Sequence, residues 1–254
     1  MRKILFISNA DSIHTIKWVK ALHQHYEILL FDWRPVTIQN YEGLQNVINI
    51  SLDSGDSGGF RIKNYVKAFL SIRKIAKSFS PDLVHAHYAS SYGILGVRAG
   101  YHPLVTSVWG TDITNYINKS WIHKQIIKFV LIMSDHICAT SHFLAQIVKR
   151  ISGKECVVTP FGVKVTGRYK TRKKKVHFYF GIVKRIDQFS GIDLAIKCFA
   201  KLKERHPEKN LKFAIAGDGP LKKEMESIVL QLGLQNHVNF HGHIHHENID
   251  NFLE

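Results

Sequence analysis

Short apolar runs alternate with segments of helical period along this chain, and that alternation constrains the fold more than any other feature. Runs rich in Ile, Val, Leu and Phe that are separated by helical segments are typical of a parallel β-sheet covered by helices. The runs of the first half are "KILFIS", "EILLF", "NVINI", "DLVHAH", "PLVTSV" and "DHICAT". The helical segments between them are 13–23, 62–79, 91–99 and 121–133. We therefore predict an α/β protein.

The alternation is interrupted once, in "TPFGVKVTGRYKTRKKKV", where Pro, Gly and a run of Lys and Arg break both periodicities. The pattern then restarts with "VHFYFGIV", "LKFAIAG" and "HVNFHG", each followed by a helical segment. The sequence thus predicts a domain at 1–160, a linker at 161–175 and a second domain at 176–254. Three parallel strands leave an open sheet edge, so we expect this second domain to be incomplete.

Composition excludes several classes of protein. Hydrophobic residues make up 45% of the chain and charged residues 22%, which is ordinary for a folded protein. The longest apolar stretches are too short to span a bilayer. Cys138, Cys156 and Cys198 are too widely separated for a metal-ligand pair and too few for an even set of disulfides. We expect a cytoplasmic protein.

The net charge of +15 is unusual, and most of it lies in the first half. Residues 1–170 hold 21 basic and 10 acidic residues, a net charge of +11. A positive electrostatic potential of this kind attracts nucleic acid, an anionic membrane surface or a phosphorylated substrate. The sequence lacks the motifs that accompany nucleic-acid binding, so we expect no nucleic acid as a partner. We predict peripheral attachment to the inner face of the cytoplasmic membrane instead.

Polar residues gather where the predicted strands of the first domain end. In open α/β sheets ligands bind outside the carboxyl ends of the strands, so residues in these loops are candidates for a site. The candidates are Ser8, Asn9, Ser12, His14, His85, His87, Gly110 and Asp112. Each has a structural alternative, since Ser12 suits a helix N-cap and Asp112 suits a cap on its own turn. Their predicted convergence at one sheet edge favours function.

The loops "VKRIDQFSG" and "GDGP" of the second domain hold a second set of candidates. Lys184 and Arg185 leave a strand and Gly191 opens a helix, a pattern suited to holding a diphosphate, although a solvated basic loop has the same composition. The nearby His241, His243, His245 and His246 lack a cysteine or carboxylate that would complete a metal set. We expect no metal and no other cofactor.

Seven segments of the chain resemble glycosyltransferase family 4. They are "FISNADSIHTIKWVKAL", "PDLVHAHYASSYGILG", "HPLVTSVWGTDI", "SDHICATSHFLAQIV", "VVTPFGV", "VKRIDQFSGIDLAIKCFAKL" and "FAIAGDGPLKKEMES", the last continuing into "LGLQNHVNFHGHI". The resemblance implies the GT-B fold, with two Rossmann-like domains that face each other across a cleft. It also implies a retaining enzyme that transfers a sugar from a nucleotide-sugar donor, without a dedicated metal, to a lipid-linked or cell-surface glycan acceptor.

The same resemblance assigns roles to residues. Asp112 would orient or deprotonate the attacking hydroxyl, with His87 and His14 beside it. Arg185 and Lys184 would bind the donor diphosphate. Ser190 stands where the family has a lysine just before Gly191, which weakens that site. The turns that approach the nucleotide would contain Gly217, Gly219, Gly242 and His243.

Family members continue beyond the position of Glu254 into a segment with paired glutamates that holds the donor. We therefore expect a truncated or split, weakly active enzyme, with a second chain as a possible source of the missing half. One alternative is a non-catalytic remnant or partner subunit. A second is a dinucleotide-dependent oxidoreductase, which Asp32 at the end of the second strand would permit but which the glycine pattern does not support.

Overall fold

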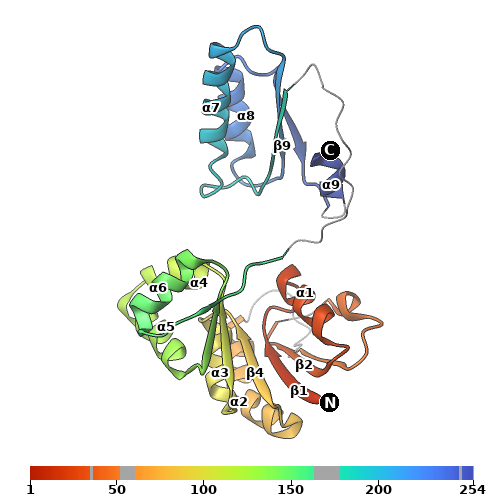
Figure 1. Cartoon of the computed structure of the whole chain (residues 1–254), viewed down its shortest axis with the longest axis vertical. Helices are drawn as coiled ribbons and strands as arrows, with labels where there is room; N and C mark the ends of the chain where they lie inside the picture. The colour runs from red at the N-terminus through yellow and green to blue at the C-terminus, as the bar shows by residue number, and fades with distance from the viewer. Residues whose placement is uncertain (35–36, 52–60, 163–177, 246–247, 254) are drawn as a thin grey trace. The chain divides into compact units, whose positions relative to one another are not determined.

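The computed structural model describes residues 1–254 except 35–36, 52–60, 163–177, 246–247 and 254. The chain divides into two compact units, Met1–Val165 and Thr166–Glu254 (Figure 1). Most of the linker predicted at 161–175 lies outside the described residues, whereas Phe161 and Gly162 belong to the first unit.

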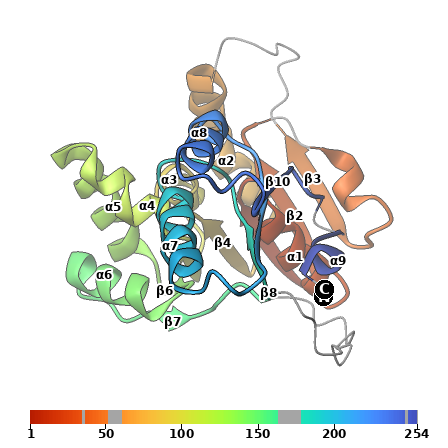
Figure 2. The ribbon, with the colours of Figure 1, turned by 90° about the horizontal axis from the view of Figure 1, so that it is seen from above.

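The first unit contains a parallel sheet with the strand order β3-β2-β1-β4-β5-β6-β7. Its strands are β1 (Arg2–Ile7), β2 (Tyr26–Asp32), β3 (Val47–Ser51), β4 (Leu83–His87), β5 (Leu104–Val108), β6 (His136–Ala139) and β7 (Val157–Val158). From β1 the chain first builds outward to β3 and then crosses back to add β4 to β7 on the other side. Figure 2 shows β2 and β3 to one side of β4, and β6 and β7 to the other. The loops that follow β1, β4 and β5 therefore meet at the middle of one sheet edge.

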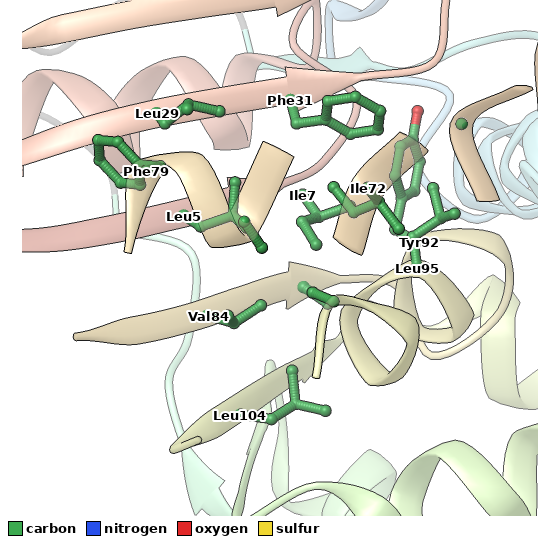
Figure 3. Packing of buried hydrophobic residues seen from close by; sticks show 14 residues of the cluster. Leu5, Ile7, Leu29, Phe31, Ile72, Phe79, Val84, Tyr92, Leu95 and Leu104 are labelled. Carbon is green, nitrogen blue, oxygen red and sulfur yellow. The ribbon is translucent and has the colours of Figure 1, made fainter. Parts of the chain in front are cut away.

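The two faces of this sheet are covered by different helices. The alternation of side chains sends Ile4 and Phe6 toward α1 (Ile13–Leu22), while Leu5 and Ile7 point to the other face. That other face is covered by α2 (Arg61–Phe79), α3 (Ser91–Ala99), α5 (Trp121–Met133) and α6 (His142–Ser152). Figure 3 shows the part of this core in which Leu5, Ile7 and Phe31 pack against Ile72, Tyr92 and Leu95.

Several short elements and one longer helix are absent from the sequence-based prediction. They are α4 (Thr111–Thr114), α6, the two-residue strand β7 and the 3-10 turns η1 (Ile38–Tyr41) and η2 (Tyr116–Asn118). Both ends of α6 are fixed by local interactions. At its start the Ser141 hydroxyl accepts from the Leu144 N–H, and at its end Gly153 adopts a left-handed conformation.

The second unit is a three-stranded parallel sheet in the order β10-β9-β8. Its elements are β8 (Phe178–Val183), α7 (Ile192–Arg205), β9 (Leu211–Ala216), α8 (Lys222–Gln231), β10 (Val238–Gly242) and α9 (Ile249–Leu253). Helices α7 and α8 lie side by side against β9 (Figure 1). Strand β8 is an edge strand among the described residues, and it leaves Phe178, Tyr179 and Phe180 exposed.

None of the helices in the described part of the chain is both long enough and apolar enough to cross a bilayer.

Candidate functional site at the carboxyl edge of the first sheet

Two histidines of β4 lie under the site on the α1 face of the sheet. His85 and His87 are both buried, and their rings are 4.5 Å apart and nearly perpendicular. Nε2 of His85 is 2.8 Å from Oγ of Ser107, and its ring packs against Phe6 and Trp18. Burial lowers the pKa of His85 to about 3, so its imidazole is neutral.

His87 is tied to the loop that follows β1. Its Nδ1 lies 2.9 Å from Oγ of Ser8 and 3.5 Å from Oγ1 of Thr15, and these two hydroxyl oxygens are 2.7 Å apart. Nε2 of His87 is buried and has no hydrogen-bond partner within the described parts of the chain. Burial, reinforced by His85 and His14, lowers the pKa of His87 well below its usual value, which keeps it neutral.

Asp112 ties the loop after β4 to the loop after β5. Its Oδ2 accepts from the Ala89 N–H at 3.0 Å, and its Oδ1 accepts from the N–H groups of Trp109 at 3.2 Å and Gly110 at 2.9 Å. The side chain is 1% exposed, and burial raises its pKa although the three donors oppose that shift. This bonding favours the turn-cap alternative for Asp112 over the role of a base that acts on a hydroxyl. Gly110 adopts φ of +129° in this turn.

Four aromatic rings surround Trp109, next to the buried histidines. The ring of His87 lies 4.7 Å from that of Trp109, Tyr88 at 5.3 Å, His14 at 5.4 Å and Phe161 at 5.6 Å. His14 also stacks on Phe161, with ring centroids 3.5 Å apart and planes 9° apart. The chain end of the first unit is thereby held beside α1, and Nζ of Lys17 strengthens this by donating to the carbonyl of Gly162 at 3.1 Å.

The remaining candidates of this edge support the backbone. Ser12 is the N-cap of α1 and accepts from the His14 N–H, as its structural alternative predicts. The Asn9 side chain accepts from the Asp11 N–H. Both residues therefore shape the loop after β1.

Asp32 is fully engaged within the first unit. Its carboxylate accepts from the Ala10 N–H at 2.9 Å and the Tyr92 hydroxyl at 2.9 Å, and it pairs with Arg34 at 3.3 Å. The side chain is 1% exposed. A dinucleotide ribose would have to displace these partners, which argues against the oxidoreductase alternative.

In the second unit the loop after β8 places cationic side chains beside the start of α7. Lys184 and Arg185 are exposed, and Nζ of Lys184 donates to the carbonyl of Ser190 at 3.0 Å. Gly191, with φ of +68°, is the N-cap of α7 and leaves open space around its Cα. Two cations next to the N–H groups of a helix N-terminus form an arrangement that suits an anion.

Two glycines bring the loop after β9 against this cationic loop. A Cβ on Gly217 would lie 1.9 Å from the carbonyl oxygen of Lys184, and a Cβ on Gly219 would lie 2.2 Å from that of Ile186. The Ile186 N–H also donates to the carbonyl of Asp218 at 3.0 Å. Only glycine permits this close approach at both positions.

Gly242 is the last residue of β10 and His243 follows it, beside the same loop. The Gly217 N–H donates to the carbonyl of Gly242 at 2.7 Å, so the two turns are in direct contact. His243 is exposed and its ring lies 5.4 Å from that of His245. Within the described residues, no three His, Cys, Asp or Glu side chains gather in a way that could hold a metal ion.

Sequence reasoning missed Thr15, Ser107 and Trp109 as members of the site. Ser107 could have been found, because it is the register partner of His87 on the neighbouring strand and so lies on the same sheet face. The parts played by Thr15 and Phe161 depend on tertiary contacts that no local pattern encodes.

Comparison with protein-family models places two families in tandem on this chain. The model described as "Glycosyl transferase 4-like" matches residues 3–141, and the model described as "Glycosyl transferases group 1" matches residues 166–254.

Individual relatives agree with these matches. A Bacillus subtilis (strain 168) protein named as a teichuronic acid biosynthesis glycosyltransferase, TuaC, is 27% identical over 155 residues, which cover 57% of this chain and 40% of that protein. Sucrose-phosphate synthase from Thermosynechococcus elongatus superposes with a TM-score of 0.71 at 13% identity, covering 99% of this chain and 73% of that one. Anabaena Alr3699/HepE, solved with UDP and glucose, gives 0.68 at 17% identity, with coverages of 96% and 70%. These likenesses show the GT-B fold.

Proposed function

Because the chain belongs to the glycosyl transferase 4-like family, we propose that it is a retaining glycosyltransferase that moves a sugar from a nucleotide-sugar donor to a lipid-linked or cell-surface glycan acceptor. The tandem match of both family models along one chain is the observation that carries this proposal. The aligned part of TuaC is less than half of that relative, so donor, acceptor and turnover are parts of the proposal.

The second unit supplies the donor side. Lys184 and Arg185 would contact the diphosphate, together with backbone N–H groups at the start of α7. The backbone at Ser190 and Gly191, the turns at Gly217, Gly219 and Gly242, and His243 would lie next to the bound donor. That HepE, which has the same fold, was solved with UDP and glucose supports a nucleotide-sugar as the donor.

The first unit supplies the acceptor side. His87 would contact a reacting group from beneath Trp109, and His14 would line the same edge. Asp112 would act indirectly, because its carboxylate holds the loop that contains Ala89 next to the loop that contains Gly110. A relative named for teichuronic acid biosynthesis supports a cell-surface glycan as the acceptor class.

Release of nucleoside diphosphate tests the proposal. The protein is incubated with a panel of UDP- and GDP-sugars and with alkyl glycosides as acceptors, and the anomeric configuration of any product is read by NMR. Product with the configuration of the donor, lost in Lys184→Ala/Arg185→Ala, supports a retaining transferase. No release above that of heat-inactivated protein with any donor would favour the non-catalytic alternative, in which β8 pairs with further strands from a second chain.

We extend the proposal to an anionic membrane surface as a partner, at the inner face of the cytoplasmic membrane. Helix α2 holds six Lys or Arg and no acidic residue, and Ile62, Val66 and Leu70, spaced four residues apart, are 80%, 50% and 67% exposed. With Lys67 and Ser71 they line a shallow apolar groove. Exposed apolar side chains flanked by cations on one helix face suit the interface of an anionic bilayer.

Helix α5, which belongs to the same layer, offers a second contact. The sequence predicts one apolar stripe on it, opposite Lys124 and Lys128, with an ordinary core-packed helix as the alternative. The stripe consists of Ile122, Ile126, Phe129, Val130 and Met133. The structure corrects this, because Val130 is buried in the core while Ile122 and Phe129 are exposed beside Trp121, which is 73% exposed. Both faces of α5 are therefore apolar, and the outer one also carries Lys124 and Lys128.

Sedimentation with vesicles tests the membrane contact. We expect the protein to bind vesicles that contain phosphatidylglycerol and not to bind vesicles of phosphatidylcholine alone. Salt should release it, because electrostatic attraction between the cations and the anionic lipids is screened over about 8 Å at physiological ionic strength. Lys67→Glu and Leu70→Ser should weaken binding. Lys201→Glu, an exposed position on α7 with the same change of net charge, should not weaken it as much. Equal effects of Lys67→Glu and Lys201→Glu would exclude α2 as the contact.

A further inference from the structure

The environment of His87 determines which of its two ring nitrogens carries the proton. Nδ1 of His87, Oγ of Ser8 and Oγ1 of Thr15 form a closed, buried triangle with sides of 2.9, 2.7 and 3.5 Å. Within the described residues, neither hydroxyl has a hydrogen bond to a side chain or to a backbone carbonyl outside this triangle. The two hydroxyl protons must therefore be accommodated inside it.

Only one tautomer of His87 accommodates both of them. If Nδ1 is unprotonated, Thr15 donates to Ser8 and Ser8 donates to Nδ1, so that each proton has an acceptor. If Nδ1 is protonated, it donates to Ser8, Ser8 donates to Thr15, and the Thr15 proton is left buried without an acceptor. In the first arrangement only the Nε2 proton of His87 lacks a partner within the described residues, whereas in the second both the Thr15 proton and the Nε2 lone pair lack one. Buried polar groups without partners are unfavourable, so the first arrangement, which leaves fewer of them, is preferred.

We infer that the Thr15–Ser8 pair holds His87 in the tautomer whose Nε2 carries the proton, so that His87 serves the site as a hydrogen-bond donor to a ligand oxygen and not as a base. Ser8 and Thr15 are then positioning residues. The ligand group is a hydroxyl or phosphate oxygen, because such an oxygen accepts from a neutral N–H.

The other ring nitrogen of His87, Nε2, supports the same conclusion. Nε2 of His87 is buried without a partner in the described part of the chain, in a ring that is itself fully buried and packs 4.7 Å from Trp109. A buried donor that lacks an acceptor is rare in folded proteins and calls for an explanation. An oxygen of the ligand supplies one. The inference rests on the proposed function for the identity of that ligand, but the tautomer itself does not depend on it.

Nitrogen NMR tests the tautomer without a donor, an acceptor or turnover. The full chain is labelled with ¹⁵N-histidine, and long-range ¹H–¹⁵N correlations at pH 7 distinguish protonated from unprotonated ring nitrogens. His87 is identified by the signal that His87→Gln removes. We expect a protonated Nε2 and an unprotonated Nδ1. A protonated Nδ1 overturns the inference, whatever a transferase assay shows.

Variants of the hydroxyl pair test its role. Ser8→Ala should shift the Nδ1 signal toward that of a ring nitrogen without a hydrogen bond, and Thr15→Val should shift it less, while Thr15→Ser should restore the wild-type position. Tryptophan fluorescence confirms that each variant is folded. An Nδ1 signal that is unchanged in both Ser8→Ala and Thr15→Val would show that the pair does not control His87, whereas graded shifts rescued by Thr15→Ser would support the relay.

Discussion

Acidification should destabilise the first unit through His85 and His87. Both imidazoles are buried and neutral, and burial lowers the pKa of each below the ordinary value of about 6.5. The unfolded chain therefore binds protons that the folded unit excludes. Stability is fully present above about pH 6.5 and is lost as the pH falls below it, since the unfolded state is then the one that gains protons.

The magnitude follows from the same linkage. A histidine that titrates normally when unfolded and remains neutral when folded costs about 2 kcal/mol of unfolding free energy between pH 7 and pH 5, so the pair costs about 4 kcal/mol. That is a large fraction of the total stability of an ordinary domain. His14, whose pKa is lowered by burial and by Lys17, acts in the same direction. Asp135, whose pKa is lowered, contributes only below this pH window.

Urea unfolding followed by tryptophan fluorescence measures this loss in the intact chain. All four tryptophans lie in the first unit, so their fluorescence reports on that unit alone. His85→Gln should remove about half of the loss between pH 7 and pH 5, whatever it does to stability at pH 7. His25→Gln, at an exposed position on the same unit, should leave the loss unaltered.

Two results would refute the reasoning. One is an unfolding free energy that changes by less than about 1 kcal/mol between pH 7 and pH 5, which linkage from two neutral histidines does not permit. The other is an undiminished loss in His85→Gln, which would place the responsible groups elsewhere.

Three further predictions concern the loops and the sheet edge. Asp112→Asn should lower the unfolding free energy of the first unit by about 1–3 kcal/mol, because an amide cannot accept from all three backbone donors; lost turnover at unchanged stability in urea would instead make Asp112 a base. Arg185→Ala should weaken UDP binding about tenfold by calorimetry, with Lys201→Ala as the unaffected control; equal affinities would remove Arg185 from the donor site. The exposed edge of β8 should make the protein self-associate with concentration in analytical ultracentrifugation, and a strictly monomeric protein would contradict this.

The strands and long helices could be predicted because burial imposes a pattern on neighbouring residues. Within "KILFIS" the residues from Ile4 to Ile7 are all apolar because β1 is covered on both faces, and α2 keeps a helical period over its whole length. Strand alternation also places His85 and His87 on one face. Helix α6 has an equally regular period, so it too could have been predicted from the sequence.

Contacts between distant loops could not be predicted. A carboxylate after a strand end looks the same in sequence whether it is a base or a cap, and only the three N–H groups around Asp112 favour the cap. Likewise, nothing in "TPFG" indicates that Phe161 stacks on His14, because the two residues are far apart along the chain. The tautomer of His87 depends on Thr15, which belongs to a helix that starts after another loop.

The four glycines of the second unit that look alike in sequence should behave differently when many variants or many related genes are sampled. At positions 217 and 219 any side chain would collide with a carbonyl of the loop after β8, so selection for folding alone should keep both as glycine. Gly191 and Gly242 have left-handed backbones but open space around them, so Asn or Asp should be found there at modest cost. Invariance of Gly217 and Gly219 would therefore reflect backbone packing alone. Only the residues found at positions 191 and 242 would be informative about the ligand.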